Sequence, residues 1–187
     1  MEYISDRIAY KRTEEDLTVY IRASSPKDKK KVQVLQIWLL LWFTAGIIIV
    51  SQLFFPGYSR EEKLFMVIYL FFWAYFAYRI AYAYYFRKYG SEVIYINNNK
   101  FMIRRDIHGK AGKPLHFVAI GKNPFRKVAE KPGSINAAFY NSFWVVSGGS
   151  ISFGEKKDEY RFGLHLSDEE TEKLITLLNK SIKLVKN

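Results

Sequence analysis

The stretch VQVLQIWLLLWFTAGIIIVSQLFFPGYS, residues 32–59, determines the class of this protein, because it contains no Asp, Glu, Lys or Arg. A second stretch, LFMVIYLFFWAYFAYRIAYAYYF at residues 64–86, contains one charged residue, Arg79. Each exceeds the roughly 20 apolar residues that a helix needs to cross a bilayer. In a chain of 187 residues of which 25% are charged, this segregation excludes a simple soluble globule. It predicts a transmembrane hairpin of two helices over residues 32–86.

Basic residues flank the outer ends of the two stretches. Four lysines between residues 27 and 31 precede the first stretch, and Arg87 and Lys88 follow the second. The connection between them is short and poor in basic residues by comparison. The positive-inside rule therefore predicts a multi-pass protein of the cytoplasmic membrane, with both termini in the cytoplasm. A signal peptide is not expected, because a mixed-charge segment comes first and the apolar run is too long.

The second stretch is unusually aromatic, since 12 of its 23 residues are Phe, Tyr or Trp. A helical projection places Tyr75, Tyr78, Arg79, Tyr82 and Phe86 in a sector of roughly 100°, which we call the aromatic stripe. Two interpretations of the stripe are open. It is either an interfacial belt from which Arg79 extends to the lipid headgroups, or a face that contacts a partner helix.

Beyond residue 87 the apolar residues alternate, as they do in strands. We expect strands near residues 92–96, 101–105, 115–120, 135–140, 143–146, 150–153 and 159–166, and an irregular loop over 121–134. Ser167 and Glu170 form a capping box at the start of an amphipathic C-terminal helix. These elements predict a mainly β (α+β) domain of about seven strands with a closing helix. One more strand, 17–23, is expected in the N-terminal segment, giving three parts: 1–31, 32–86 and 87–187.

A family resemblance rests on two neighbouring segments: SISFG, from Ser150 to Gly154, and YRFGLHLSDEE, from Tyr160 to Glu170. Together these segments resemble the closing strand-to-helix passage of the bacterial pleckstrin-homology-like (PH-like) membrane proteins, a largely uncharacterised family. The order of elements over residues 32–187 is similar to theirs, and the strand 17–23 resembles an N-terminal segment of some members. The resemblance implies a PH-like fold and a scaffold role beside the membrane, and it brings no catalytic residues.

The sequence contains no pattern that is typical of an active site. The absence of Cys excludes disulfides, Cys-ligated metals and a thiol nucleophile. His108, His116 and His165 lack the spacing and the acidic neighbours of a metal site. The pair Gly112-Lys113 lacks the other residues of a phosphate-binding loop. We therefore expect no enzyme activity, no cofactor and no metal.

The net charge of +11 is concentrated just after the second apolar stretch, since residues 87–131 contain 11 basic and 3 acidic residues. Beyond Arg87 and Lys88 these cations form a basic block: Lys100, Arg104, Arg105, Lys110, Lys113, Lys122, Arg126, Lys127 and Lys131. Near an anionic leaflet each Lys or Arg contributes about 1 kcal/mol of attraction. The block either binds lipid or only sets the topology. No nucleic-acid-binding motif accompanies it, so nucleic acid is not an expected partner.

One functional hypothesis leads. The chain is a non-enzymatic accessory, assembly or scaffold subunit of a cytoplasmic-membrane complex, with integral membrane partners contacted through the aromatic stripe. Trp144 and the loop 121–134 are further candidate contact regions. The first alternative is a module that binds or senses anionic lipid through Lys100, Arg104, Arg105, Arg126 and Lys127. The second alternative, an enzyme on a membrane substrate, requires His116 and His165 to converge with a carboxylate.

Overall fold

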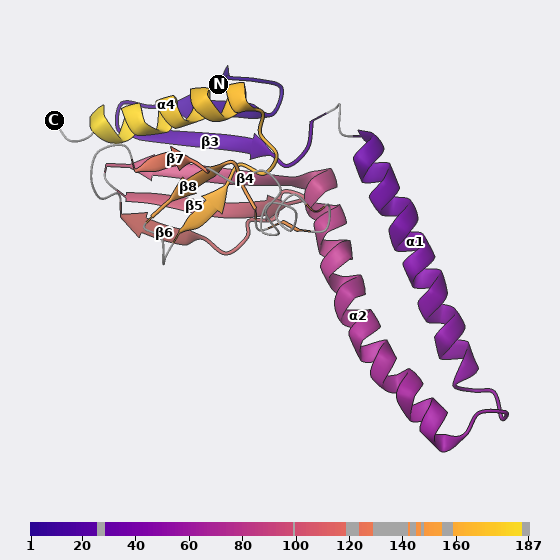
Figure 1. Ribbon diagram of the computed structural model, residues 1–187. Helices are drawn as coiled ribbons and strands as arrows, with labels where there is room; N and C mark the ends of the chain where they lie inside the picture. Colours follow the sequence, from indigo (N-terminus) through magenta and orange to yellow (C-terminus); the bar gives the residue numbers. More distant parts are fainter. Residues whose placement is uncertain are drawn as a thin grey trace.

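A computed structural model describes residues 1–25, 29–98, 100–118, 124–128, 142, 145–146, 148–154 and 159–184 (Figure 1). Three strands come first: β1 (Glu2–Tyr3), β2 (Ile8–Arg12) and β3 (Asp16–Arg22). The helical hairpin follows, made of α1 (Lys29–Gln52) and α2 (Arg60–Tyr89). The remaining elements are β4 (Gly90–Asn97), β5 (Lys100–Ile107), β6 (Leu115–Val118), β7 (Phe125–Lys127), β8 (Ile151–Phe153), β9 (Tyr160–Phe162) and α4 (Asp168–Leu184).

The hairpin is inserted between two strands that are neighbours in one sheet. β3 pairs with β4 in antiparallel register along its whole length, from Asp16 opposite Asn97 to Arg22 opposite Ser91. The pairing continues one step further, because the Ala23 N–H donates to the Gly90 carbonyl at 3.0 Å. Both helices therefore leave the sheet at the same end, while the N-terminus and α4 lie on the side away from the hairpin tip (Figure 1).

Two antiparallel sheets and α4 enclose one hydrophobic core. The larger sheet has the strand order β1-β2-β3-β4-β5-β6, and the smaller one has the order β7-β8-β9. Alternate residues of β3 face the core, and Leu17, Val19 and Ile21 are at most 2% exposed. The other elements contribute further buried residues: Ile8, Ile94, Ile96, Phe101, Ile103, Phe125, Ile151, Phe162, Leu174, Leu178 and Ile182. The N-terminal strands are thus part of the same core as the C-terminal half of the chain.

The hairpin consists of two helices, Val32–Gln52 and Arg60–Tyr89, that are long and apolar enough to cross a membrane. The most apolar 18-residue windows of the two helices have mean hydropathies of 2.2 and 1.7. The helices pack through Trp42 and Trp73. The Trp73 indole N–H donates to the Trp42 carbonyl at 3.0 Å, and the Trp42 indole N–H donates to the Trp73 carbonyl at 3.4 Å. Gly46 makes room for the Trp73 ring, since a Cβ at this position would lie 2.2 Å from it.

The base of α2 is held inside the sheet domain. Phe86 is fully buried and packs in a second cluster with Ala23, Ala83, Val146 and Leu164. The Gly90 N–H donates to the Phe86 carbonyl, so the helix continues into β4 without a linker. The hairpin is therefore fixed to the sheet by core contacts as well as by the chain itself.

The structure confirms the coarse architecture: two long apolar helices, then a mostly antiparallel sheet domain and a C-terminal helix. The capping box of α4 is present, with the Glu170 N–H donating to Ser167 Oγ at 3.2 Å and the Ser167 N–H donating to the Glu170 carboxylate at 2.9 Å. The strands expected at 92–96, 101–105, 115–120 and 150–153 correspond to β4, β5, β6 and β8. The strand expected at 135–140 lies outside the described residues, as do Phe143 and Trp144.

Two local predictions are wrong. The loop expected over 121–134 contains β7, which pairs with β8. The strand expected at 159–166 ends at Phe162, because Gly163 and His165 adopt left-handed backbone angles (φ +75° and +53°) that a strand does not allow. β1 and β2 were not expected, since their sequence has few apolar residues. With β3 they extend the sheet across the boundary expected between residues 1–31 and 87–187.

The strand pairing predicts that residues 90–187 alone do not fold. This fragment loses Ile8, Leu17, Val19 and Ile21, each at most 2% exposed in the whole chain. Burial of one such side chain is worth about 1.5–3 kcal/mol, so the total approaches the 5–15 kcal/mol that stabilise a typical domain. We expect the fragment to elute as an aggregate in size-exclusion chromatography and to unfold without a cooperative transition.

A matched variant that keeps β1–β3 should fold without the hairpin. Because Ala23 and Gly90 oppose each other, an Asn-Gly dipeptide in place of residues 24–89 can join β3 to β4 through a two-residue turn. We expect a cooperative thermal transition followed by circular dichroism. Cooperative unfolding of 90–187 alone, or none in the joined variant, would contradict the assignment of β3 to the core.

Candidate functional site at the base of the helical hairpin

Most of the aromatic stripe is exposed on the outer side of α2. On a helical projection it lies roughly opposite Trp73, which packs on α1. Tyr75 and Tyr78 are 58% and 70% exposed, and Arg79 and Tyr82 are exposed as well. Arg79 has no ion-pair or hydrogen-bond partner in the part of the chain that the structure describes. Phe86 does not belong with the others, because it is buried in the sheet domain.

The contact between the two tryptophans sets the relative depth of the helices. Since each indole bonds the main chain of the other residue, Trp42 and Trp73 lie nearly level. Arg79, six residues after Trp73, then lies at the depth of the first turns of α1, which carry Gln33 and Gln36. From Gln36 to Gln52 the helix rises about 24 Å at 1.5 Å per residue, most of a 30 Å hydrocarbon layer. The charged and amide side chains at the sheet end of both helices therefore begin at one common level.

The structure does not gather the basic block onto one face. Arg104 pairs with Asp106 at 3.1 Å, and Lys127 pairs with Asp168 of α4 at 2.9 Å. The hydrogen bond to Asp168 raises the pKa of Lys127. Lys100 lies at the far end of β5, opposite Asn97, about 23 Å from the hairpin base at 3.3 Å per residue. The other members are either exposed or outside the described residues: Lys110, Lys113 and Arg126 are exposed, and Lys122 and Lys131 are not described.

Arg105, also predicted to be a contact residue, is committed to a buried carboxylate. Glu92 is 1% exposed, and its two oxygens accept from Arg105 Nε at 3.0 Å and from the Gly163 N–H at 2.6 Å. Burial is the largest single effect and lowers the pKa of Arg105, but the charge and hydrogen bond of Glu92, together with nearby Tyr160 and Tyr82, raise it overall. Burial also raises the pKa of Tyr160 nearby. This ion pair joins β4, β5 and the turn after β9, so its role is structural.

Two further arginines fix the segment between β9 and α4. The Arg7 guanidinium is 5% exposed and donates to the carbonyls of Arg22, Ala23, Leu164 and His165 at 2.7–3.1 Å. Arg87, in the last turn of α2, lies 3.1 Å from His165 Nε2. These contacts hold the hairpin base, the end of β3 and the start of α4 together.

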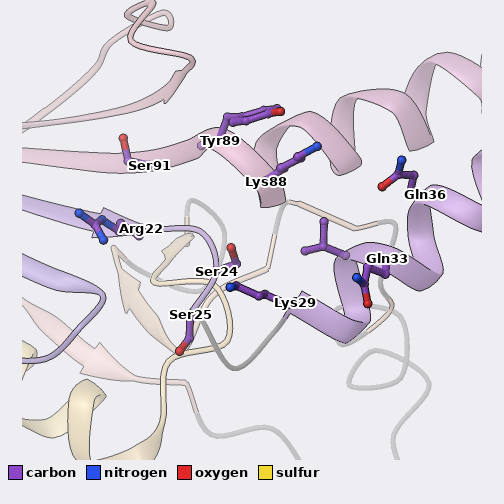
Figure 2. A pocket seen from close by; sticks show the side chains of 11 residues that line it. Arg22, Ser24, Ser25, Lys29, Gln33, Gln36, Lys88, Tyr89 and Ser91 are labelled. Carbon is purple, nitrogen blue, oxygen red and sulfur yellow. The ribbon is translucent and has the colours of Figure 1, made fainter.

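A groove of about 710 Å³ lies between the hairpin base and the larger sheet (Figure 2). Three cations line it from three elements: Arg22 at the end of β3, Lys29 at the start of α1 and Lys88 in the last turn of α2. Its other lining residues are mostly polar, namely Ser24, Ser25, Gln33, Gln36, Tyr89 and Ser91, with Val32 and Gly90 in addition. No acidic residue is among these lining residues of the described chain. We call this the basal groove.

Sequence reasoning did not identify the basal groove. In the sequence Lys29 and Lys88 indicate topology, and Arg22 belongs to a predicted strand, so nothing relates the three. They line one groove because β3 pairs with β4, which brings the two ends of the hairpin together. The sequence does contain one usable signal. A predicted strand lies before the first apolar stretch and another after the second, and basic residues stand where each strand meets its stretch.

A second groove, of about 460 Å³, contains His165 together with Glu169 and Glu170. Its carboxylates are already used within the chain, since Glu170 accepts from Ser5 Oγ at 2.6 Å and Glu169 pairs with Lys173 at 2.6 Å. Burial is the largest single effect and raises the pKa of Glu170, but the hydrogen bonds from Ser5 and Ser167 and the charge of Arg7 together lower it overall. His116 is exposed on β6 and lines neither groove. Within the described ranges no three His, Asp or Glu side chains are placed to hold a metal ion.

Comparisons with known proteins do not add a relative to this picture. No family model, no curated protein and no solved structure matches the chain significantly. Function is therefore inferred from the residues and their geometry.

The buried Glu92–Arg105 pair predicts that two charge-removing substitutions lower the unfolding free energy by very different amounts. Glu92→Gln leaves the Arg105 charge in a largely buried site, which should lower the unfolding free energy by about 3–5 kcal/mol. Arg104→Gln breaks the more exposed pair with Asp106 and should cost less than about 1 kcal/mol. Denaturant unfolding of the whole chain in detergent, followed by tryptophan fluorescence, measures both. Equal losses would show that the Glu92 pair is not the buried connection described above.

Proposed function

We propose that this chain is a non-enzymatic accessory or scaffold subunit of a cytoplasmic-membrane complex. Its hairpin spans the membrane and contacts an integral membrane partner, and its sheet domain, of PH-like type with three added N-terminal strands, is held at the cytoplasmic surface as a docking unit. The observation that carries the proposal is the outer face of α2, where Tyr75, Tyr78 and Arg79 point away from α1.

The strand pairing supports the topology. Because β3 and β4 are hydrogen-bonded neighbours, a membrane-spanning hairpin between them leaves both flanking segments on one side of the membrane. Lys29 and Lys88 lie at the base of the hairpin on that side, and cytoplasmic flanks are rich in such residues. The opposite end has the charge-balanced sequence 60–63. We therefore assign the sheet domain and both termini to the cytoplasm.

The outer face of α2 supports a protein partner. Tyr75 and Tyr78 precede Arg79 on α2 by four residues and one, so they lie about 6 Å and about 1.5 Å to the apolar side of the level marked by Gln36. A hydroxyl without an acceptor is costly in a hydrocarbon environment, and a hydrogen bond between helices contributes about 0.6–2 kcal/mol. A partner helix with acceptor groups would supply these bonds. Arg79 is at the polar level itself, so its guanidinium can reach either the partner or the headgroups.

The two alternatives have less support. A lipid sensor built on the basic block would need free cations beside the membrane, whereas Arg104, Arg105 and Lys127 are in ion pairs within the chain. Lys100 is about 23 Å from the hairpin base, nearly three Debye lengths at physiological salt. An enzyme that uses His116 and His165 has no shared groove to support it.

The topology can be tested with single cysteines, because the natural chain has none. We expect Tyr58→Cys at the hairpin tip to react with a membrane-impermeant maleimide in intact spheroplasts. Glu14→Cys and Lys110→Cys lie in the sheet domain, which we assign to the cytoplasm. Both should therefore react only after permeabilisation. Labelling of either sheet position in intact spheroplasts, or recovery of the chain in the soluble fraction, would contradict the proposed anchoring.

The partner face can be tested by site-specific photo-crosslinking in native membranes. A crosslinking amino acid at Tyr78 should give a discrete adduct with another protein, because this position is exposed opposite α1. The matched control carries the crosslinking amino acid in place of Ile47, which is 68% exposed on α1. This control should react with lipid only. Similar adducts from both positions, or none from Tyr78, would rule against a partner face on α2.

A further inference from the structure

We propose that the basal groove binds the phosphate headgroup of one anionic phospholipid of the cytoplasmic leaflet. The inference rests on the proposed membrane-spanning hairpin and goes beyond the scaffold role. It assigns lipid recognition to Arg22, Lys29 and Lys88, none of which belongs to the basic block of residues 100–131.

The first reason is uncompensated charge. Arg22, Lys29 and Lys88 line one groove without a carboxylate partner in the described parts of the chain, in contrast to Arg104, Arg105 and Lys127. The ammonium of Lys88 is held in place, because it donates to Tyr84 Oη at 2.9 Å and lies 5.1 Å from the centre of the Tyr89 ring. Like charges in a shared groove repel one another, and a bound anion removes that repulsion.

The second reason is depth. Gln36, at one end of the groove, marks the level where polar side chains begin on both helices. Lys29 lies seven residues nearer the sheet, about 10 Å along the helix axis. The headgroup layer beyond the hydrocarbon is roughly 5–8 Å thick on each side, and long basic side chains extend several ångströms further. The cations of the groove therefore lie at the outer edge of the headgroup layer, within side-chain reach of the lipid phosphates, which favours a phospholipid over a soluble phosphate compound.

The third reason is the mixture of donors and apolar surface. Arg22 offers a planar set of N–H donors that fits phosphate oxygens, and hydroxyls of Ser24 and Ser91 lie in the same groove (Figure 2). Beyond Val32 the exposed side of α1 becomes apolar, with Val34 and Ile37 each 61% exposed, which suits the acyl chains. A zwitterionic headgroup would add a positive charge to a groove that already holds three, so the geometry selects for net negative lipids.

The experiment is a lipid titration of the whole purified chain in nonionic detergent, followed by native mass spectrometry. The probes are phosphatidylglycerol, phosphatidylcholine and the soluble compound glycerol 3-phosphate. The test variant combines Arg22→Gln, Lys29→Gln and Lys88→Gln. The matched control combines Lys100→Gln, Lys110→Gln and Arg126→Gln, which removes the same charge from exposed positions outside the groove.

We expect one phosphatidylglycerol to bind saturably, with little binding of the other two probes. Removal of each groove cation should weaken phosphatidylglycerol binding roughly fivefold, so the test variant should bind about a hundredfold more weakly. The affinity of the control should stay within about threefold of that of the natural chain. Arg22→Lys alone keeps the charge and should lose less affinity than Arg22→Gln, which separates lipid binding from misfolding. Thermal unfolding of each variant in the same detergent verifies that the fold is retained.

Several outcomes would overturn the inference: equal binding of phosphatidylcholine, unchanged affinity in a folded test variant, an equal loss in the control, or saturable binding of glycerol 3-phosphate that displaces the lipid. The last result would assign the groove to a soluble phosphate compound. None of these results changes the maleimide pattern expected for the hairpin, so failure of the lipid site and failure of the membrane anchor are distinguishable.

Discussion

The antiparallel pairing of β3 with β4 is the constraint on which the rest of the structure depends. The two strands are separated in the chain by both long helices, yet they form a continuous ladder from Asp16–Asn97 to Arg22–Ser91. The ladder closes the chain around the hairpin, so α1 and α2 must leave and return at one end of the sheet. It also places the side chains of β2 and β3 in the core that the C-terminal half of the chain would otherwise lack.

The same pairing explains how the charges are arranged. Where the chain is closely packed, its cations are matched inside the molecule: Arg105 with Glu92, and Arg7 with four main-chain carbonyls. Such partners are required because a buried charge without them is strongly unfavourable. Where the hairpin meets the sheet, Arg22, Lys29 and Lys88 line one groove, and no carboxylate is among its described lining residues. The contrast between these two environments separates structural cations from those available to a ligand.

Some parts of this fold were predictable because their signals are local. The two long apolar helices follow from the absence of charge over long stretches, and α4 follows from its capping box and apolar face. β4 and β5 follow from their apolar, β-branched and aromatic residues on either side of the turn predicted at 97–99. β7 was not predictable, because its three residues, Phe125–Lys127, have no periodicity and are strands only through pairing with β8. β1 and β2 were missed for the same reason, since register with β3 rather than composition makes them strands.

The candidate site divides in the same way. The sequence by itself determined that two apolar helices form a hairpin, that basic residues mark its base and that the aromatic residues of α2 lie on one stripe, because charge and helical period act between near neighbours in the chain. Only the tertiary structure decided which cations are free. Pairing between separate segments neutralised Arg105 and Lys127, buried Phe86 in the domain, and brought Arg22, Lys29 and Lys88 to one groove. Such long-range pairing leaves no local pattern in a single sequence.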